Sequence, residues 1–135
     1  MPACAQSSAE RGDRAAFLAG CGGSTDVGPV PQATVADPAA AGRHLFTSAF
    51  PGCSGCHTFL AAGASGTVGP DLAARLRDDA ESAGKQLKPF VYQSIIAPNA
   101  YIAEGYPRGV MPQDFGDRLT NEQLAELIAF ITGNV

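Results

Sequence analysis

The chain has 135 residues, of which 45% are hydrophobic and 16% charged, so its composition suits one folded domain and not a disordered or membrane-spanning protein. Nine Lys and Arg against thirteen Asp and Glu give a formal net charge of -4, and no basic run is present, which argues against a nucleic-acid partner. The four cysteines, Cys4, Cys21, Cys53 and Cys56, are too few and too unevenly spread for a disulfide scaffold.

Residues 1–36 are expected to form an export or anchor region followed by a flexible tether. Within them, residues 20–36 are rich in Gly, Pro, Ser and Thr and have no apolar period, which is typical of a tether. The sequence assigns no role to Cys4. A single folded domain is predicted over residues 37–135.

The domain is predicted to begin with a helix. Asp37 is a suitable N-terminal cap, and Pro38 suits the first helical position, where a missing N–H costs nothing. Apolar residues then repeat at i, i+3, i+4 and i+7, namely Gly42, Leu45, Phe46 and Ala49. His44 would lie opposite this face and is expected to be a surface residue.

Two shorter helices are predicted in the middle of the chain. The first covers residues 71–80, with Leu72 and Leu76 on one side. The second covers residues 88–98 and ends at Pro98. Its apolar i, i+4 pairs are Val91 with Ile95 and Tyr92 with Ile96.

The last helix has the clearest pattern. Thr120 and Gln123 form a capping-box sequence at its start. Its buried face is predicted to contain Leu124, Leu127, Ile128 and Ile131. Since no segment alternates as a strand does, the predicted fold class is all-α. Residues 98–119 have no steady period, and a bulky apolar cofactor would supply the core that so long a loop lacks.

Residues 52–59, GCSGCHTF, place two thiols and an imidazole within five positions. C-x-x-C alone is open to interpretation as a redox dithiol, half of a zinc site or a short disulfide. A thioredoxin-like dithiol is expected to follow a strand, and none is predicted before Cys53. A zinc site needs four ligands, and the other candidates are Cys4, Cys21, His44 and scattered carboxylates.

The histidine that directly follows the second cysteine favours a different chemistry. C-x-x-C-H is the attachment signature of c-type haem, in which both thiols, here Cys53 and Cys56, add to the haem vinyl groups. The adjacent His57 would then ligate the iron. Besides Met1, the chain contains one methionine, Met111, whose thioether suits the sixth iron position and would raise the reduction potential.

Three motifs, GCSGCH, VGPDL and GVMP, precede the C-terminal amphipathic helix in this order. This arrangement resembles a class I, monohaem cytochrome c domain over about residues 37–133. The resemblance implies a cytochrome c fold, with three main helices, a short extra helix and long loops around one covalently attached haem. It also implies a tight crossing of the first and last helices at Gly42, Phe46 and Phe130.

The resemblance implies further roles for individual residues. Pro70 matches a proline whose carbonyl accepts a hydrogen bond from the proximal histidine and orients its ring. Tyr101, Tyr106 and Arg108 lie in the methionine-bearing loop, where related domains place donors to the haem propionates. The alternative interpretations are a turn proline and ordinary exposed loop residues.

The function expected from this resemblance is electron transfer by a single haem with His57/Met111 ligation, and not enzymatic catalysis. The partners would be extracytoplasmic respiratory or photosynthetic redox proteins, and the chain is expected to be a monomer. The alternatives are a haem-based gas-binding or sensing protein, an accessory cytochrome subunit of an oxidoreductase complex, and a metal or redox dithiol protein without haem.

Residues 17–25, FLAGCGGST, resemble the lipobox of bacterial lipoproteins, in which Cys21 would be the lipidated first residue. Haem attachment of this type occurs outside the cytoplasm in bacteria, so the expected location is the periplasm or the outer face of the cytoplasmic membrane. Residues 1–16 are too polar for the central region of a signal peptide. We favour a misplaced start codon over an accidental lipobox, because the Gly/Ser tether suits membrane anchoring.

Overall fold

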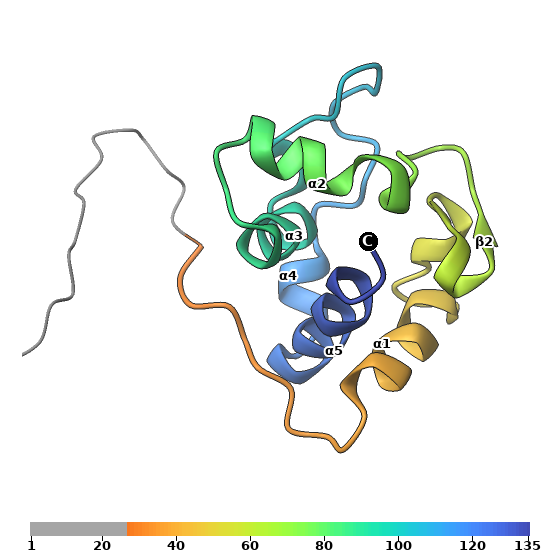
Figure 1. Ribbon diagram of the computed structural model, residues 1–135, viewed down its shortest axis with the longest axis vertical. Coiled ribbons are helices and arrows are strands. Elements are labelled where there is room, and N and C mark those ends of the chain that lie inside the picture. The colour runs from red at the N-terminus through yellow and green to blue at the C-terminus, as the bar shows by residue number, and fades with distance from the viewer. Residues whose placement is uncertain (1–26) are drawn as a thin grey trace, which may run out of the picture.

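The computed structural model describes residues 27–135, so Cys4 and Cys21, with the predictions made for them, lie outside the described residues. Its longer helices are α1 (Pro38–Thr47), α2 (Leu72–Ser82), α3 (Leu87–Ile96) and α5 (Asn121–Thr132) (Figure 1). Shorter elements are α4 (Phe115–Arg118) and the 3-10 turns η1 (Cys53–Gly55), η2 (Leu60–Ala62) and η3 (Pro98–Ala100). The predicted all-α class is confirmed. None of the helices described combines the length and apolar character that crossing a membrane requires.

The first helix, α1, begins where the sequence predicts. The carboxylate of Asp37 accepts a hydrogen bond from the amide of Ala40 at 3.0 Å, and Pro38 occupies the first turn. The helix ends before Ala49, which the periodicity had placed on its apolar face and which is exposed. The buried residues of α1 are Gly42 and Phe46.

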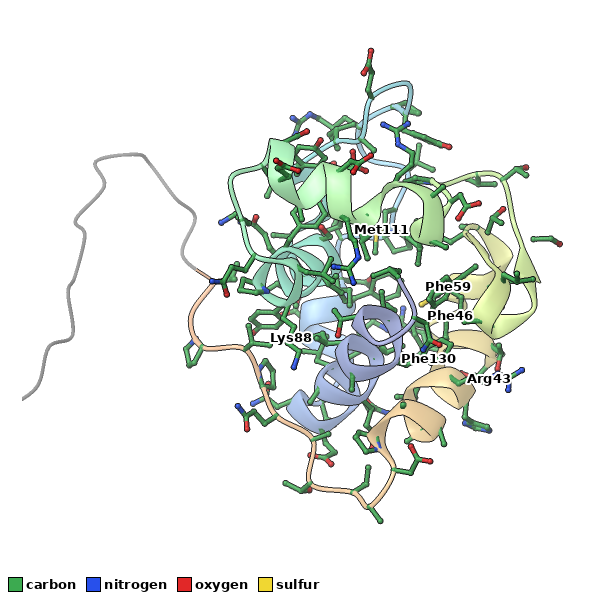
Figure 2. All side chains as sticks on the ribbon, in the orientation of Figure 1. Arg43, Phe46, Phe59, Lys88, Met111 and Phe130 are labelled. Carbon is green, nitrogen blue, oxygen red and sulfur yellow. The ribbon has the colours of Figure 1, made fainter. Side chains whose placement is uncertain are left out.

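Helices α1 and α5 cross in very close contact. A Cβ atom on Gly42 would lie 2.0 Å from the carbonyl oxygen of Glu126 and 2.7 Å from Cβ of Phe130, so only glycine admits this approach. Beside the crossing, the rings of Phe46, Phe59 and Phe130 pack with centroids 5.4 to 5.9 Å apart (Figure 2). The tight crossing that the resemblance implies is therefore present.

The predicted apolar faces of the other helices largely form the core. Buried members are Leu72 and Leu76 on α2, Val91 and Ile95 on α3, and Leu124, Leu127, Ile128 and Ile131 on α5. Tyr92 and Ile96 are only partly buried, whereas Phe90, which the pairing pattern did not include, is buried. At the start of α5, the amide of Gln123 donates to the hydroxyl of Thr120 and the amide of Thr120 donates to the side chain of Gln123, which completes the predicted capping box.

The segment predicted to lack regular structure between residues 98 and 119 is partly helical. It begins with η3 and ends after α4, where Phe115 and Leu119 are buried, and residues 101–114 between them form no helix or strand. The sequence also did not predict the antiparallel pair of β1 (Thr58–Phe59) and β2 (Ala64–Ser65). Strands of two residues are too short to show an alternating pattern.

Residues 27–36, predicted as the end of the tether, contact the helical body (Figure 1). Glu122 Oε1 accepts hydrogen bonds from the amide and hydroxyl of Thr34, at 2.7 and 3.0 Å, and from the amide of Val35 at 3.2 Å. The bond from the Thr34 backbone is the main reason why the pKa of Glu122 is lowered. Val30 packs against the core. A domain boundary at residue 37 stays a prediction.

Candidate functional site

The Cys-x-x-Cys-His motif forms one tight turn shortly after α1. It follows Gly52, whose φ of 75° is in the left-handed region that favours glycine. The carbonyl oxygen of Cys53 accepts hydrogen bonds from the amides of Cys56 at 3.2 Å and His57 at 3.0 Å. The Cys53 thiol is partly buried, which raises its pKa to about 11, and Cys56 is exposed. One turn of backbone therefore holds both thiols and the imidazole.

The backbone also orients the imidazole of His57. Its Nδ1 lies 2.8 Å from the carbonyl oxygen of Pro70. Because a carbonyl oxygen can only accept, Nδ1 carries the proton, and Nε2 of the neutral ring keeps its lone pair. Burial lowers the pKa of His57, and the hydrogen bond to Pro70 offsets part of that effect. The ring is thus held neutral, with one nitrogen able to bind a metal.

Two glycines allow residues 66–70 to lie directly against the motif. A Cβ on Gly69 would be 2.6 Å from Cε1 of His57, and a Cβ on Gly66 would be 2.6 Å from the carbonyl carbon of Cys56. The amide of Gly69 donates to the carbonyl of Cys56 at 2.8 Å. The sequence did not predict that Gly66 and Gly69 would pack against the motif. The available signal was the position of Gly69, directly before the predicted Pro70.

Two adjoining cavities lie beside the motif. Their volumes, each including its open mouth, are about 1010 and 550 Å³. Predicted site residues that line both are Cys53, His57 and Met111. The larger cavity is also lined by Cys56, Pro70, Tyr101 and Tyr106. The walls are otherwise mainly apolar, with contributions from Leu72, Leu76, Phe115 and Pro51.

The methionine-bearing segment supplies one wall of this space. Met111, labelled in Figure 2, is partly buried, packs against the core and lines both cavities together with Leu72 and Leu76 of α2. The hydroxyl of Tyr101 donates to Asp79 at 3.2 Å. Arg108, by contrast, is exposed, does not line either cavity, and donates through Nη1 to the carbonyl of Asn99 at 2.9 Å. Seven of the eight predicted cofactor residues therefore surround one space, and Arg108 does not.

Sequence reasoning missed an acidic group in the cavity wall. Asp79 lines the larger cavity and is only 7% exposed. On α2, Asp79 lies seven residues after Leu72 and three residues after Leu76, so the three share one helical face, and both leucines line the same cavity. A carboxylate on an apolar helical stripe was the signal that could have identified it.

The groups around this space suit a haem. Two thiols from one turn, a neutral imidazole and a thioether meet an apolar cavity, which is the donor set of c-type haem. A protein-family model described as Cytochrome c matches residues 39–134. No curated protein matches the chain significantly. The family implies haem-based electron transfer, and its domains are typically electron carriers and not enzymes. The chain therefore belongs to the cytochrome c family, with one haem c held covalently through the Cys-x-x-Cys-His motif at Cys53 and Cys56.

Proposed function

We propose that the protein is a monohaem electron carrier whose iron has His57 and Met111 as axial ligands. The observation that carries this proposal is that both side chains line the same two cavities as Cys53. The hydrogen bond from His57 to Pro70 supports it further, because it leaves Nε2 available for a metal. The bound haem supplies the one-electron change at the iron, and His/Met ligation raises its potential.

The remaining cavity residues would exclude water and stabilise the cofactor. Leu72, Leu76 and Phe115 form buried apolar walls, and a dry surround changes the reduction potential. Tyr101 and Tyr106 are proposed donors to the haem propionates, a role that Tyr101, whose one O–H donates to Asp79, would take up only by giving up that bond. Arg108 is proposed in the same role, because its guanidinium has further N–H donors besides the Nη1 group that donates to the Asn99 carbonyl.

The mouth of the larger cavity is the proposed docking face for redox partners. Val68 and Val110 line that cavity and are 51% and 48% exposed, so they offer apolar surface near the site. With a net charge of -4, the chain favours a partner with a basic docking patch. We propose extracytoplasmic respiratory or photosynthetic partners, a monomeric carrier in the periplasm or on the outer face of the cytoplasmic membrane, and anchoring through a lipidated Cys21.

A second candidate function is haem-based gas binding or sensing, alone or as an accessory cytochrome subunit. It is favoured by one observation, that Met111 belongs to residues 101–114, which form no helix or strand. A methionine on such a segment can leave the iron with less disruption than one on a packed helix.

Visible absorption of the full chain, made with a cytochrome c maturation system, tests the proposal. The wild type is expected to give a low-spin spectrum with a weak far-red band from methionine-to-iron charge transfer. Met111→Ala should lose this band, and the neighbouring control Val110→Ala should keep it. A high-spin wild-type spectrum, or one that Met111→Ala leaves unchanged, would exclude Met111 as a ligand and favour sensing at an open iron.

A further inference from the structure

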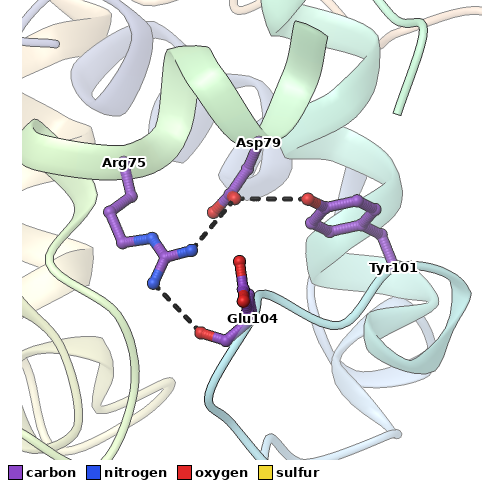
Figure 3. A network of polar contacts seen from close by, with 4 residues as sticks. All are labelled: Arg75, Asp79, Tyr101 and Glu104. Atoms are coloured by element: carbon purple, nitrogen blue, oxygen red, sulfur yellow. Dashed lines mark hydrogen bonds and ion pairs between the residues drawn. The ribbon is translucent and has the colours of Figure 1, made fainter. Parts of the chain in front are cut away.

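A polar network joins the methionine-bearing segment, residues 101–111, to helix α2 (Figure 3). On α2, Arg75 Nη2 lies 3.6 Å from Asp79 Oδ1. From the segment, the hydroxyl of Tyr101 donates to the same Asp79 oxygen at 3.2 Å. Arg75 Nη1 donates to the carbonyl oxygen of Glu104 at 3.0 Å. We call these contacts the Arg75–Asp79 network, and two of its members, Asp79 and Tyr101, line the larger cavity.

Burial of Asp79 makes the contacts of its carboxylate costly to break. The Asp79 side chain is only 10% exposed, and a buried charge that loses its partners is strongly destabilising. The ring of Tyr101 packs edge-on against Phe90 of α3, with centroids 5.2 Å apart, so its hydroxyl is held toward α2. Burial and the charge of Asp79 raise the pKa of Tyr101, which keeps the hydroxyl protonated as a donor.

Tyr101 also shares a side-chain hydrogen bond with Ser82 of α2, and further polar contacts link residues close in the chain around the methionine. The amide of Gly109 donates to the side chain of Asn99 at 2.9 Å, and Gln113 donates to the Met111 carbonyl at 2.6 Å. These bonds shape the turn before and after the methionine, but they do not attach it to a long helix. The Arg75–Asp79 network makes that attachment, together with the bond between Tyr101 and Ser82.

We propose that Arg75 and Asp79 are positioning residues that hold segment 101–111 closed over the cavity and thereby set how readily an outside ligand displaces Met111. This inference rests on the proposed His57/Met111 ligation. A competing ligand binds only when the segment opens, so its apparent affinity follows the open fraction. Loss of one hydrogen bond to a charged group raises that fraction roughly tenfold or more.

Imidazole binding to the full, haem-containing ferric protein tests the proposal. Tyr101→Phe removes one hydroxyl and keeps the ring that packs on Phe90, and Arg75→Gln removes the charged contacts. Arg77→Gln is the matched control, because Arg77 is on the same helix but donates to the Val135 carbonyl. We expect roughly tenfold tighter imidazole binding in the two network variants, followed by loss of the far-red band, and wild-type affinity in the control.

Wild-type imidazole affinity in both network variants would overturn the proposal. Amide hydrogen exchange of residues 101–110 tests the same attachment without reference to the iron. It should be faster in Arg75→Gln and Tyr101→Phe while α5 exchanges as in the wild type, and equal acceleration in α5 would indicate a merely general loss of stability. If the wild type itself lacks the far-red band, the ligation proposal fails together with the displacement of Met111, and hydrogen exchange alone decides whether the network positions the segment.

Discussion

Replacement of Gly42 by alanine tests the close crossing of α1 and α5. The new Cβ would lie 2.0 Å from the Glu126 carbonyl oxygen and 2.7 Å from Cβ of Phe130. Carbon and carbonyl oxygen normally stay about 3.3 Å apart or more, so the helices must separate locally by about 1.3 Å. Neither obstructing atom can rotate away, because one belongs to the backbone and the other is attached directly to it.

The expected cost follows from two opposing effects. Overpacking a close contact costs about 1–3 kcal/mol. Alanine in place of glycine inside a helix increases the free energy of unfolding by about 1 kcal/mol. Because the contact is with rigid atoms of α5, we expect the cost near its upper limit and a net destabilisation of Gly42→Ala of about 2 kcal/mol. For a domain of this size, that lowers Tm by about 8–16 °C.

Thermal and guanidinium unfolding of the haem-containing protein, followed by far-UV circular dichroism, measures this loss. The variants Arg43→Gly and Arg43→Ala provide the control, because Arg43 is exposed on α1 and projects outward (Figure 2). Their difference gives the helix propensity effect alone, in which alanine is the more stable. A Gly42→Ala protein as stable as the wild type, or more stable, would refute the reasoning.

Three further predictions concern the core, a cap and the leading segment. Phe59→Ala removes a side chain that is 0% exposed and should lower the free energy of unfolding, measured in guanidinium, by about 3–5 kcal/mol. Phe59→Leu should lower it clearly less. Small and equal decreases in the two variants would contradict this prediction. Thr120→Ala should cost about 1 kcal/mol by the same assay, and Thr120→Ser, which keeps the capping hydroxyl, should stay near the wild type. The pKa of Glu122 is lowered from 4.5, chiefly by the Thr34 backbone bond, so its contribution is present at neutral pH and is lost as the pH falls through the lowered value. NMR should then show the amides of Thr34 and Val35 losing protection only below pH 4.5, with Glu122→Gln removing that dependence; full protection at all pH values would argue against the contact.

The features that the sequence predicts correctly depend on interactions between residues close in the chain. A helix that packs on a core repeats apolar residues at a helical period, as Leu124, Leu127 and Ile128 do. Its caps lie within three residues of their partners, as the bond between Asp37 and Ala40 shows. The turn at Cys53–Gly55 is equally local, and its motif can be recognised in the sequence without knowledge of the rest of the fold.

The features that the sequence does not predict join residues far apart. Arg75 binds a backbone carbonyl at Glu104, so no pattern of side chains could indicate the contact. Glu122 binds backbone and hydroxyl groups of a segment whose composition suggested only a tether. Gly69 is needed because the His57 ring lies against it, and this contact exists only after the chain folds back.

The crossing of α1 and α5 also means that the core needs both ends of the described fold. The two helices are the first and last of the described fold, and the faces buried between them include Phe46 and Phe130. A chain is made from its N-terminus, so this core lacks one half until α5 has emerged. Cys53 and Cys56 are made well before that point. Until α5 is available, the chain therefore presents its thiols beside an incomplete core.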